Sequence, residues 1–430
     1  MKRSLLHRCL SVATVAGAAG AILLTSTPAY AGTPVLVSAA GSDTTQDVMG
    51  DYLATQNATS TVYNGTTYDV TTKNIPAFST SAFATPAETN CPATSWVKDT
   101  LAPTAVTTPT LGIAPFGSGA GRDYLNYEQQ TALAGQKGCV DIARSSSGKR
   151  TDGTTNGTDP AGAEYYAFAM DTVSWATTSL KAPATLTLAQ LQGIYNCTIT
   201  NWDQVGGTTG AITPYLPQPG SGTRSFFLGS TGFSIPTPSA LCVPASREIE
   251  ENQAKTVAVA DIDSAIMPYS AALWNYQQSN RANPTIDKRN GARLGGYTTG
   301  AAVPVKATPS QWVAGDNQYE MATTPLIGFL GLPASYAVVS ETNISVATPA
   351  FSGTNDYRGV RYVYNVVNSG GPVSSYEAAK ALVGFDTVGP FKSAMCSGGG
   401  SSSIQTFGMA TLDTTNPNAL NPTASTCRKV

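Results

Sequence analysis

The pattern that most limits the fold of this chain occurs four times. An apolar run of strand length ends in a short stretch rich in glycine, serine and threonine, and a helix-compatible segment follows three of these stretches. We call them the first to fourth corners: residues 41–45 (GSDTT), 117–121 (GSGAG), 144–150 (RSSSGKR) and 217–224 (PQPGSGTR). Strands that alternate with helices predict an α/β fold, in which ligands gather at the carboxyl ends of strands. The corners have no fixed spacing, which excludes a solenoid.

The segments beside the corners give specific predictions. The run 46–56 (QDVMGDYLATQ) predicts a helix that buries Val48, Met49, Tyr52 and Leu53. Thr44, three residues before Asp47, resembles a capping box. Strands are expected at 34–40, 110–116, 138–143 and 211–216, further helices at 122–135 and 225–229, and an embellishment in the Thr/Ala/Pro-rich stretch 56–110.

The first 31 residues have the parts of a secretory signal peptide. A basic start precedes an apolar run from about Leu10 to Leu24, and the small-residue pattern Ala29-Tyr30-Ala31 follows. No later window contains about 20 apolar residues, so no membrane span is predicted. Cys9 precedes the apolar run and is not placed to carry a lipid. We therefore expect a secreted protein that begins at Gly32 and has no anchor.

Charge and histidine content limit the function. Cleavage removes three basic residues and His7, which is the only histidine, and leaves 22 basic against 27 acidic residues. A net charge near −5 argues against nucleic acid as a partner. Without histidine, Ser-His-Asp and Cys-His catalysis and histidine-ligated zinc are excluded. Ser146 and Lys149 fit S-x-x-K, but neither S-D-N nor K-T-G follows. We expect no enzyme activity, metal or cofactor.

Six cysteines remain after cleavage: Cys91, Cys139, Cys197, Cys242, Cys396 and Cys427. An even number in an exported chain predicts three disulfides, and the sequence allows 15 pairings. We favour pairing between neighbours, because each bond then closes one local loop. About 400 residues exceed a single core and predict two lobes.

The corners have the chemistry that a tetrahedral oxyanion requires. A helix N-terminus supplies free N–H groups, and glycine lets the backbone approach the ligand closely. Serine and threonine hydroxyls both donate and accept, which suits a partly protonated anion. One such corner is usually only a cap or a turn. Four in one chain indicate a shared ligand.

The corner sequences resemble those of the phosphate-binding proteins of ABC importers, in the type II periplasmic-binding-protein superfamily. The segments AAGSDTTQDVM, FGSGAG, VDIARSSS and GSGTRSFF are similar to the four ligand loops of that family. Residues 186–207 resemble its Leu-Thr, helix, Ile-Thr-Asn-Trp segment, and RYVYNVVN resembles its return strand. The resemblance implies a two-lobed α/β fold with mixed sheets flanked by helices and two hinge crossings. Lobe 1 would comprise 32–170 and 360–430, and lobe 2 would comprise 171–359.

The resemblance also implies a ligand set. Thr44 and Gly222 would donate backbone N–H groups, and Ser118, Ser221 and Thr223 hydroxyls. Two positions depart from the family, since Pro217 stands where it has arginine and Ser146 where it has aspartate. Arg144, Arg224 and Asp43 are candidates to compensate, unless Asp43 is only an N-cap and both arginines form surface or lobe-to-lobe pairs. Asn201 and Trp202 are expected to be structural.

The function implied is capture of a small oxyanion, with inorganic phosphate first, by a monomeric secreted protein that serves an ABC permease. An acceptor aspartate distinguishes protonated phosphate from sulfate, because a buried carboxylate facing a full anion is unfavourable. With serine at that position, sulfate, molybdate and phosphorylated organic molecules are further candidate ligands. The alternative is a secreted or wall-associated recognition protein that kept the fold. A phosphate-ester hydrolase is the third and weakest hypothesis.

Overall fold

The computed structural model describes residues 32–77, 83–85, 94–96, 115–129, 140–149, 159–183, 185–228, 242–299, 301–302, 360–412 and 427–429. The predicted signal peptide, Cys91 and Cys139 lie outside these residues. The division into two lobes stays a prediction.

A mixed sheet with 11 strands organises the described residues, and eight of these strands follow the order β2-β3-β1-β6-β16-β7-β12-β9. Its strands are β1 (Thr33–Gly41), β2 (Thr59–Tyr63), β3 (Thr66–Asn74), β6 (Ile142–Ser145), β7 (Ala163–Thr177), β9 (Thr213–Pro214), β12 (Ala265–Ser270), β13 (Arg293–Leu294), β16 (Val360–Asn368), β17 (Ala410–Thr411) and β18 (Arg428–Lys429). Smaller sheets contain β10 (Leu216–Pro217) with β11 (Glu248–Ile249), β4 (Phe83–Thr85) with β5 (Thr94–Trp96), and β8 (Thr185–Leu186) with β14 (Gly296–Thr299) and β15 (Ala301–Ala302). The α/β class predicted from the sequence is confirmed.

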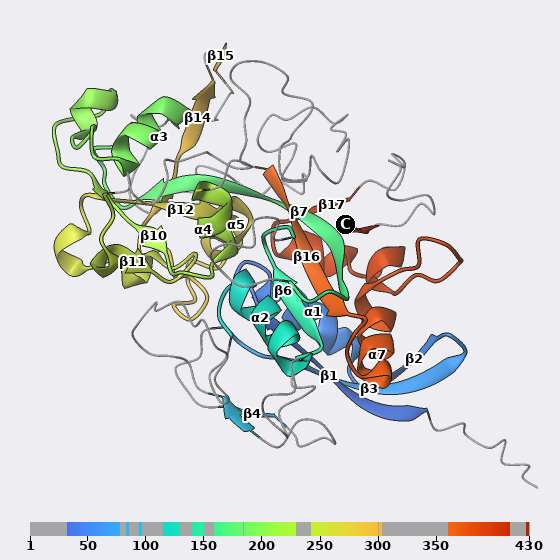
Figure 1. Ribbon diagram of the computed structural model, residues 1–430. Helices are drawn as coiled ribbons and strands as arrows, with labels where there is room; N and C mark the ends of the chain where they lie inside the picture. Colours follow the sequence, from blue (N-terminus) through green and yellow to red (C-terminus); the bar gives the residue numbers. More distant parts are fainter. Residues whose placement is uncertain are drawn as a thin grey trace, which may run out of the picture. The chain divides into compact units, whose positions relative to one another are not determined.

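Strand β7 connects two regions of this sheet (Figure 1). Residues 163–172 pair with β16 in antiparallel orientation, and residues 173–177 pair with β12. Strand β16 also pairs with β6, so the returning chain lies between β6 and β7. Strands β1 and β6 are parallel, with Gly41 opposite Arg144. The first and third corners therefore emerge side by side at one edge of the sheet.

Helix α1 (Gln46–Gln56) has the predicted bounds and buries the four predicted residues. The predicted capping box is wrong. The N-cap residue is Thr45, which makes no side-chain cap bond, and the hydroxyl of Thr44 donates to Glu251 instead. Helix α2 (Ser118–Gln129) begins four residues before the predicted start at 122. Gly121 lets this helix lie close against β1, because a Cβ there would lie 2.7 Å from the Cα of Gly41.

Further helices are α3 (Leu188–Tyr195), α4 (Gly222–Leu228), α5 (Ala271–Ser279), α7 (Val373–Val383) and α8 (Ser401–Thr406), with 3-10 turns η1 (Trp202–Val205), η3 (Ala245–Arg247), η4 (Ala254–Thr256), η5 (Val259–Asp261) and η9 (Met395–Ser397). The predicted strand 138–143 appears as β6, which begins at Ile142. The predicted strand 211–216 appears as two short strands, β9 and β10, which pair in different sheets. Most of the predicted strand 110–116 lies outside the described residues.

The interpretation of 56–110 as an embellishment is wrong for its first part. Residues 59–74 form β2 and β3, an antiparallel hairpin of the main sheet. Threonine is β-branched and suits a strand. Asn64 and Gly65 both have positive φ, 49° and 77°, as the tightest hairpin turn requires.

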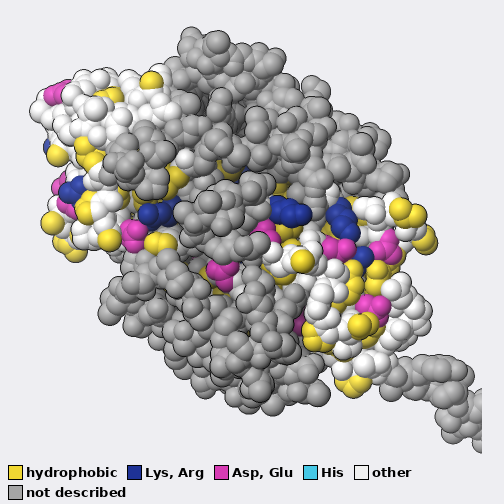
Figure 2. All heavy atoms as spheres, in the orientation of Figure 1, with side chains coloured by type: hydrophobic (Ala, Val, Ile, Leu, Met, Phe, Trp, Pro, Cys, Tyr) yellow, Lys and Arg dark blue, Asp and Glu magenta, His cyan; other side chains and the backbone are white. Residues whose placement is uncertain are grey.

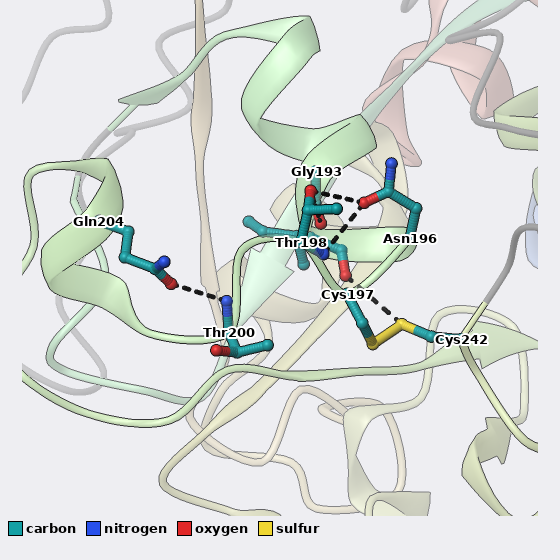
Figure 3. The surroundings of a disulfide bond; sticks show 8 residues. Gly193, Asn196, Cys197, Thr198, Thr200, Gln204 and Cys242 are labelled. Atoms are coloured by element: carbon teal, nitrogen blue, oxygen red, sulfur yellow. Dashed lines mark hydrogen bonds between the residues drawn. A yellow bond between two sulfur atoms is a disulfide. The ribbon is translucent and has the colours of Figure 1, made fainter.

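Two of the three predicted disulfides are present. Cys197 bonds to Cys242 and Cys396 bonds to Cys427, and Figure 3 shows the first of these beside the end of α3. The third predicted pair, Cys91 with Cys139, lies outside the described residues. Asn201 caps η1, while Trp202 is fully buried and stacks on Trp175, with ring centroids 6.4 Å apart. Both residues are therefore structural, as expected.

Basic and acidic side chains lie intermixed on the described part of the face shown in Figure 2. Within the described residues, no helix has both the length and the apolar character needed to cross a membrane.

Candidate functional site

The first three corners meet through a cluster of serine hydroxyls. Ser42 Oγ donates to Ser146 Oγ at 3.0 Å, and Ser118 Oγ lies 3.2 Å from the same atom. The backbone N–H of Ser146 donates to Ser118 Oγ at 2.8 Å. All three side chains are fully buried. Hydroxyls from positions 42, 118 and 146 thus share one interior space.

The fourth corner lies against this cluster, and glycine makes the contact possible. A Cβ on Gly222 would overlap Ser118 Oγ and Ser146 Oγ, and it would lie 3.0 Å from the carbonyl carbon of Ser146. Gly119 N–H donates to the carbonyl of Gly220 at 2.9 Å. The structure therefore brings all four corners together.

A carboxylate that the sequence analysis did not identify lies beside the first and fourth corners. Glu251 Oε1 accepts from Thr44 Oγ1 at 2.7 Å, from Thr223 N at 3.2 Å and from Thr223 Oγ1. The side chain is 1% exposed, and within the described residues its Oε2 has no hydrogen-bond partner. Glu251 follows β11 in a turn, where no sequence motif marks it.

An arginine on β16 completes this group. Arg361 Nη2 donates to Thr223 Oγ1 at 2.9 Å and to Thr44 Oγ1 at 3.3 Å. The same nitrogen forms an ion pair with Asp171 on β7 at 2.8 Å. Arg361 is 3% exposed, and among the described residues its Nη1 has no hydrogen-bond partner. The available signal in the sequence is a charged residue within a strand that is otherwise mostly apolar, namely Arg361 in β16 and Asp171 in the middle of β7.

The family assignment follows from a match over residues 28–311, which fit the model described as a PBP superfamily domain. The chain belongs to the PBP superfamily. This membership places it among substrate-binding proteins rather than enzymes. No curated protein sequence matches the chain.

Solved structures similar to this PBP-superfamily chain include two binding proteins. One is a putative phosphate ABC transporter substrate-binding protein with bound phosphate from Clostridium perfringens, at 14% identity and a TM-score of 0.44, with 87% of this chain and 99% of that chain covered. The other is an ABC-type phosphate transport receptor from Vibrio cholerae, at 15% identity and a TM-score of 0.43, with 87% and 99% covered.

Of the two arginines predicted to compensate for Pro217, Arg144 lies on β6 opposite Gly41 of β1 and is fully buried. Its guanidinium donates to the carbonyls of Ala39, Ser42 and Ile75 and to Asn74. Among the described residues its Nη2 has no partner. Burial lowers its pKa to about 10, although Asp43 and Asp47 oppose this shift. Most of its hydrogen bonds therefore go to backbone carbonyls, and its role as a ligand stays a prediction.

Arg224 occupies a different environment. It forms an ion pair with Glu248 at 2.7 Å and donates to the carbonyl of Pro217 at 2.8 Å. Ser221 Oγ accepts from the backbone N–H of Arg224 at 3.0 Å, as a helix cap does. The structure does not bring the Arg224 guanidinium to the group formed by Thr44, Thr223 and Glu251. For Arg224, as for Arg144, a role as a ligand stays a prediction.

Asp43 lies between the corners and a neighbouring cavity. It is 6% exposed, and its Oδ2 accepts from Gln218 at 3.4 Å. Within the described residues its Oδ1 has no partner. The alternative that Asp43 is an N-cap is wrong, since Thr45 holds that position. Burial, then Glu251 and Glu250, raise the pKa of Asp43 well above its usual range, against the opposing effects of Arg144 and Lys288.

Asp43→Asn is expected to stabilise the protein increasingly as pH rises. The folded state holds the proton of Asp43 more tightly than the unfolded state, so folding stability falls as pH increases from the usual carboxyl range through the raised value. Asparagine cannot ionise, so the Asp43→Asn variant does not lose folding stability in this way as pH rises. Urea midpoints between pH 4 and pH 8 would measure the effect, with Asp203→Asn at an exposed position as the control. A constant difference across this range would contradict the raised pKa.

Proposed function

We propose that this protein captures a small oxyanion, with inorganic phosphate as the first candidate, and delivers it to an ABC permease after export. The observation that carries the proposal is the environment of Glu251 Oε1. Three donors from the first and fourth corners, Thr44 Oγ1, Thr223 N and Thr223 Oγ1, surround this one carboxylate oxygen. A donor set that surrounds an anionic oxygen of the protein suits an anionic oxygen of a solute.

In this proposal the Glu251 carboxylate stands, before the solute binds, where an oxygen of the solute would otherwise lie. Binding requires the carboxylate to leave, because two negative groups within a few ångströms repel strongly in a buried site. Arg361 would then donate its Nη1, which has no partner among the described residues, to the entering anion. Arginine beside two hydroxyls is a common arrangement for phosphate recognition.

The choice between phosphate and sulfate depends on Asp43. Because its pKa is raised, this carboxyl can carry a proton and donate it in a hydrogen bond. A protonated carboxyl can donate a hydrogen bond to phosphate or to sulfate. An ionised carboxylate can only accept a hydrogen bond, so it would favour an anion that still carries a proton. We therefore expect phosphate to bind, with weaker discrimination against sulfate than an ionised aspartate would impose.

Glu251→Gln is expected to bind phosphate at least about tenfold more tightly than the native protein, which corresponds to about 1.4 kcal/mol. Glutamine keeps the size and one acceptor oxygen but removes the competing charge. Isothermal titration calorimetry with phosphate and sulfate would measure both affinities. The control is Glu248→Gln, which removes an equal charge from the ion pair with Arg224.

Two results would decide against parts of this proposal. If neither the native protein nor Glu251→Gln binds phosphate or sulfate at millimolar concentration, oxyanion capture is wrong. If both proteins bind phosphate equally, Glu251 does not compete with the ligand. The alternative of a recognition protein without a transport role stays open, and neighbouring permease and ATPase genes would favour transport.

A further inference from the structure

A cavity of about 460 Å³ adjoins the corners and shares two wall residues with them. Glu251 and Asn252 both line the cavity, and both also bind Thr44 Oγ1, at 2.7 Å and 3.2 Å. The other walls come from α1, α5 and residues 285–288. This volume lies within the range of about 300–1,000 Å³ that small-molecule sites occupy. A bare tetrahedral anion has only five heavy atoms and would leave most of the space unused.

The charge of the cavity is opposite to that expected for a phosphate site. Four carboxyl groups line it, from Asp43, Asp47, Asp51 and Glu251, whereas Lys288 is the single basic residue among its lining residues. Asp47 and Asp51 lie one turn apart on α1 and face the same side. An acidic cavity concentrates cations and repels free anions.

Two of these carboxylates are both buried and incompletely paired. Asp43 is 6% exposed and Glu251 is 1% exposed. Asp43 Oδ1 and Glu251 Oε2 have no hydrogen-bond partner among the described residues. Buried polar atoms are nearly always paired in folded proteins, so Glu251 Oε2, and Asp43 Oδ1 when that carboxyl is ionised, indicate a donor that a ligand would supply.

An aromatic pair indicates that this donor belongs to an organic group. Tyr276 and Phe407 line the cavity, with ring centroids 4.5 Å apart. Faces of aromatic rings attract ammonium groups and cover the methylenes beside them. Among the described residues, no group of three or more carboxylate, cysteine or histidine side chains is arranged to hold a metal ion. The wall therefore suits an organic ammonium better than a bare cation.

We propose that the ligand carries both charges: an oxyanion bound at the corners and an ammonium group, a few bonds away, bound in the cavity. An aminoalkyl phosphate has this chemistry. This inference rests on the proposed oxyanion function. Glu251 and Asn252 support it, because they contact the first corner and also line the cavity, so one short molecule can reach from the corners into the cavity. A Glu251 carboxylate displaced by the anion would remain beside the ammonium group.

Calorimetry with three probes tests the inference: inorganic phosphate, phosphoethanolamine and ethanolamine. The native protein is expected to bind phosphoethanolamine at least about tenfold more tightly than phosphate, and ethanolamine more weakly than either. The double variant Asp47→Asn/Asp51→Asn is expected to lose most of this preference for phosphoethanolamine. Asp203→Asn/Asp263→Asn removes the same charge from exposed positions outside the cavity lining and should keep the preference.

The outcomes separate this inference from the proposed function. Equal affinity for phosphate and phosphoethanolamine would overturn the ammonium subsite and leave oxyanion capture intact. An unchanged preference in Asp47→Asn/Asp51→Asn would also overturn it, because the acidic wall would then not recognise the cation. If ethanolamine binds and neither phosphate compound does, the oxyanion function itself is wrong.

Discussion

Arg361→Met is expected to destabilise the protein by about 3–5 kcal/mol, the usual cost of removing one partner of a buried ion pair. Arg361 and Asp171 lie directly opposite each other on β16 and β7. The side chain of Arg361 is 3% exposed and that of Asp171 is 0% exposed. Methionine would fill much of the arginine's space but leave the Asp171 carboxylate buried without its counter-charge. The midpoint of urea unfolding would measure the loss.

A second arginine provides the matched control. Arg224 and Glu248 form an ion pair of nearly the same length, 2.7 Å, but the arginine side chain is 23% exposed. The Glu248 side chain is 9% exposed, so the pair is only partly buried, and Arg224→Met is expected to cost clearly less than Arg361→Met. The double variant Arg361→Met/Asp171→Leu should recover much of the loss, since it leaves no unpaired buried charge. If Arg361→Met and Arg224→Met lowered the free energy of unfolding equally, burial of the Arg361–Asp171 pair would not add to the cost of breaking it.

Gly222→Ala is expected to destabilise the protein by about 1–3 kcal/mol, because it places a methyl group in a closely packed interior. The added Cβ would overlap two hydroxyl oxygens, Ser118 Oγ and Ser146 Oγ, and lie 3.0 Å from the backbone carbon of Ser146. Relief requires the fourth corner to move away from the second and third. We therefore also expect weaker phosphate binding, measured by calorimetry beside thermal unfolding.

Gly148→Ala is the control for this substitution. An added Cβ there would lie 3.5 Å from Tyr364 Oη, which is ordinary van der Waals contact. The expected stability change is within about 0.5 kcal/mol. If Gly222→Ala were as mild as Gly148→Ala, the corners would not be packed as closely as the structure has them.

Local signals in the sequence predicted several elements correctly. Helix α1 has the predicted bounds and buries the predicted face, because a 3.6-residue periodicity depends only on residues near one another in the chain. The hairpin of β2 and β3 also has a local signal, Asn64-Gly65 between two threonine-rich runs, but the sequence analysis assigned this stretch to an embellishment instead. Its place in the main sheet, however, depends on the parallel pairing of β3 with β1, for which the sequence has no mark.

The partners of the site residues could not be predicted in the same way. Thr44 fits a local capping pattern, yet its hydroxyl donates to Glu251, which is 207 residues away. Arg361 approaches Thr44 and Thr223 only because β16 pairs with β7 in one register, and a shift of one residue would turn its side chain to the other face of the sheet.

The sequence by itself determined the four corners, the α/β class and the supply of hydroxyl and backbone donors. These features depend on periodicity, turn chemistry and composition, which are properties of short stretches of chain. Only the tertiary structure decided which charges face those donors: Glu251 as an anionic neighbour, Arg361 as the cation, and an acidic cavity beside them. The physical reason is that the energy of a charge depends on its burial and its partners, and strand register sets both over separations of hundreds of residues.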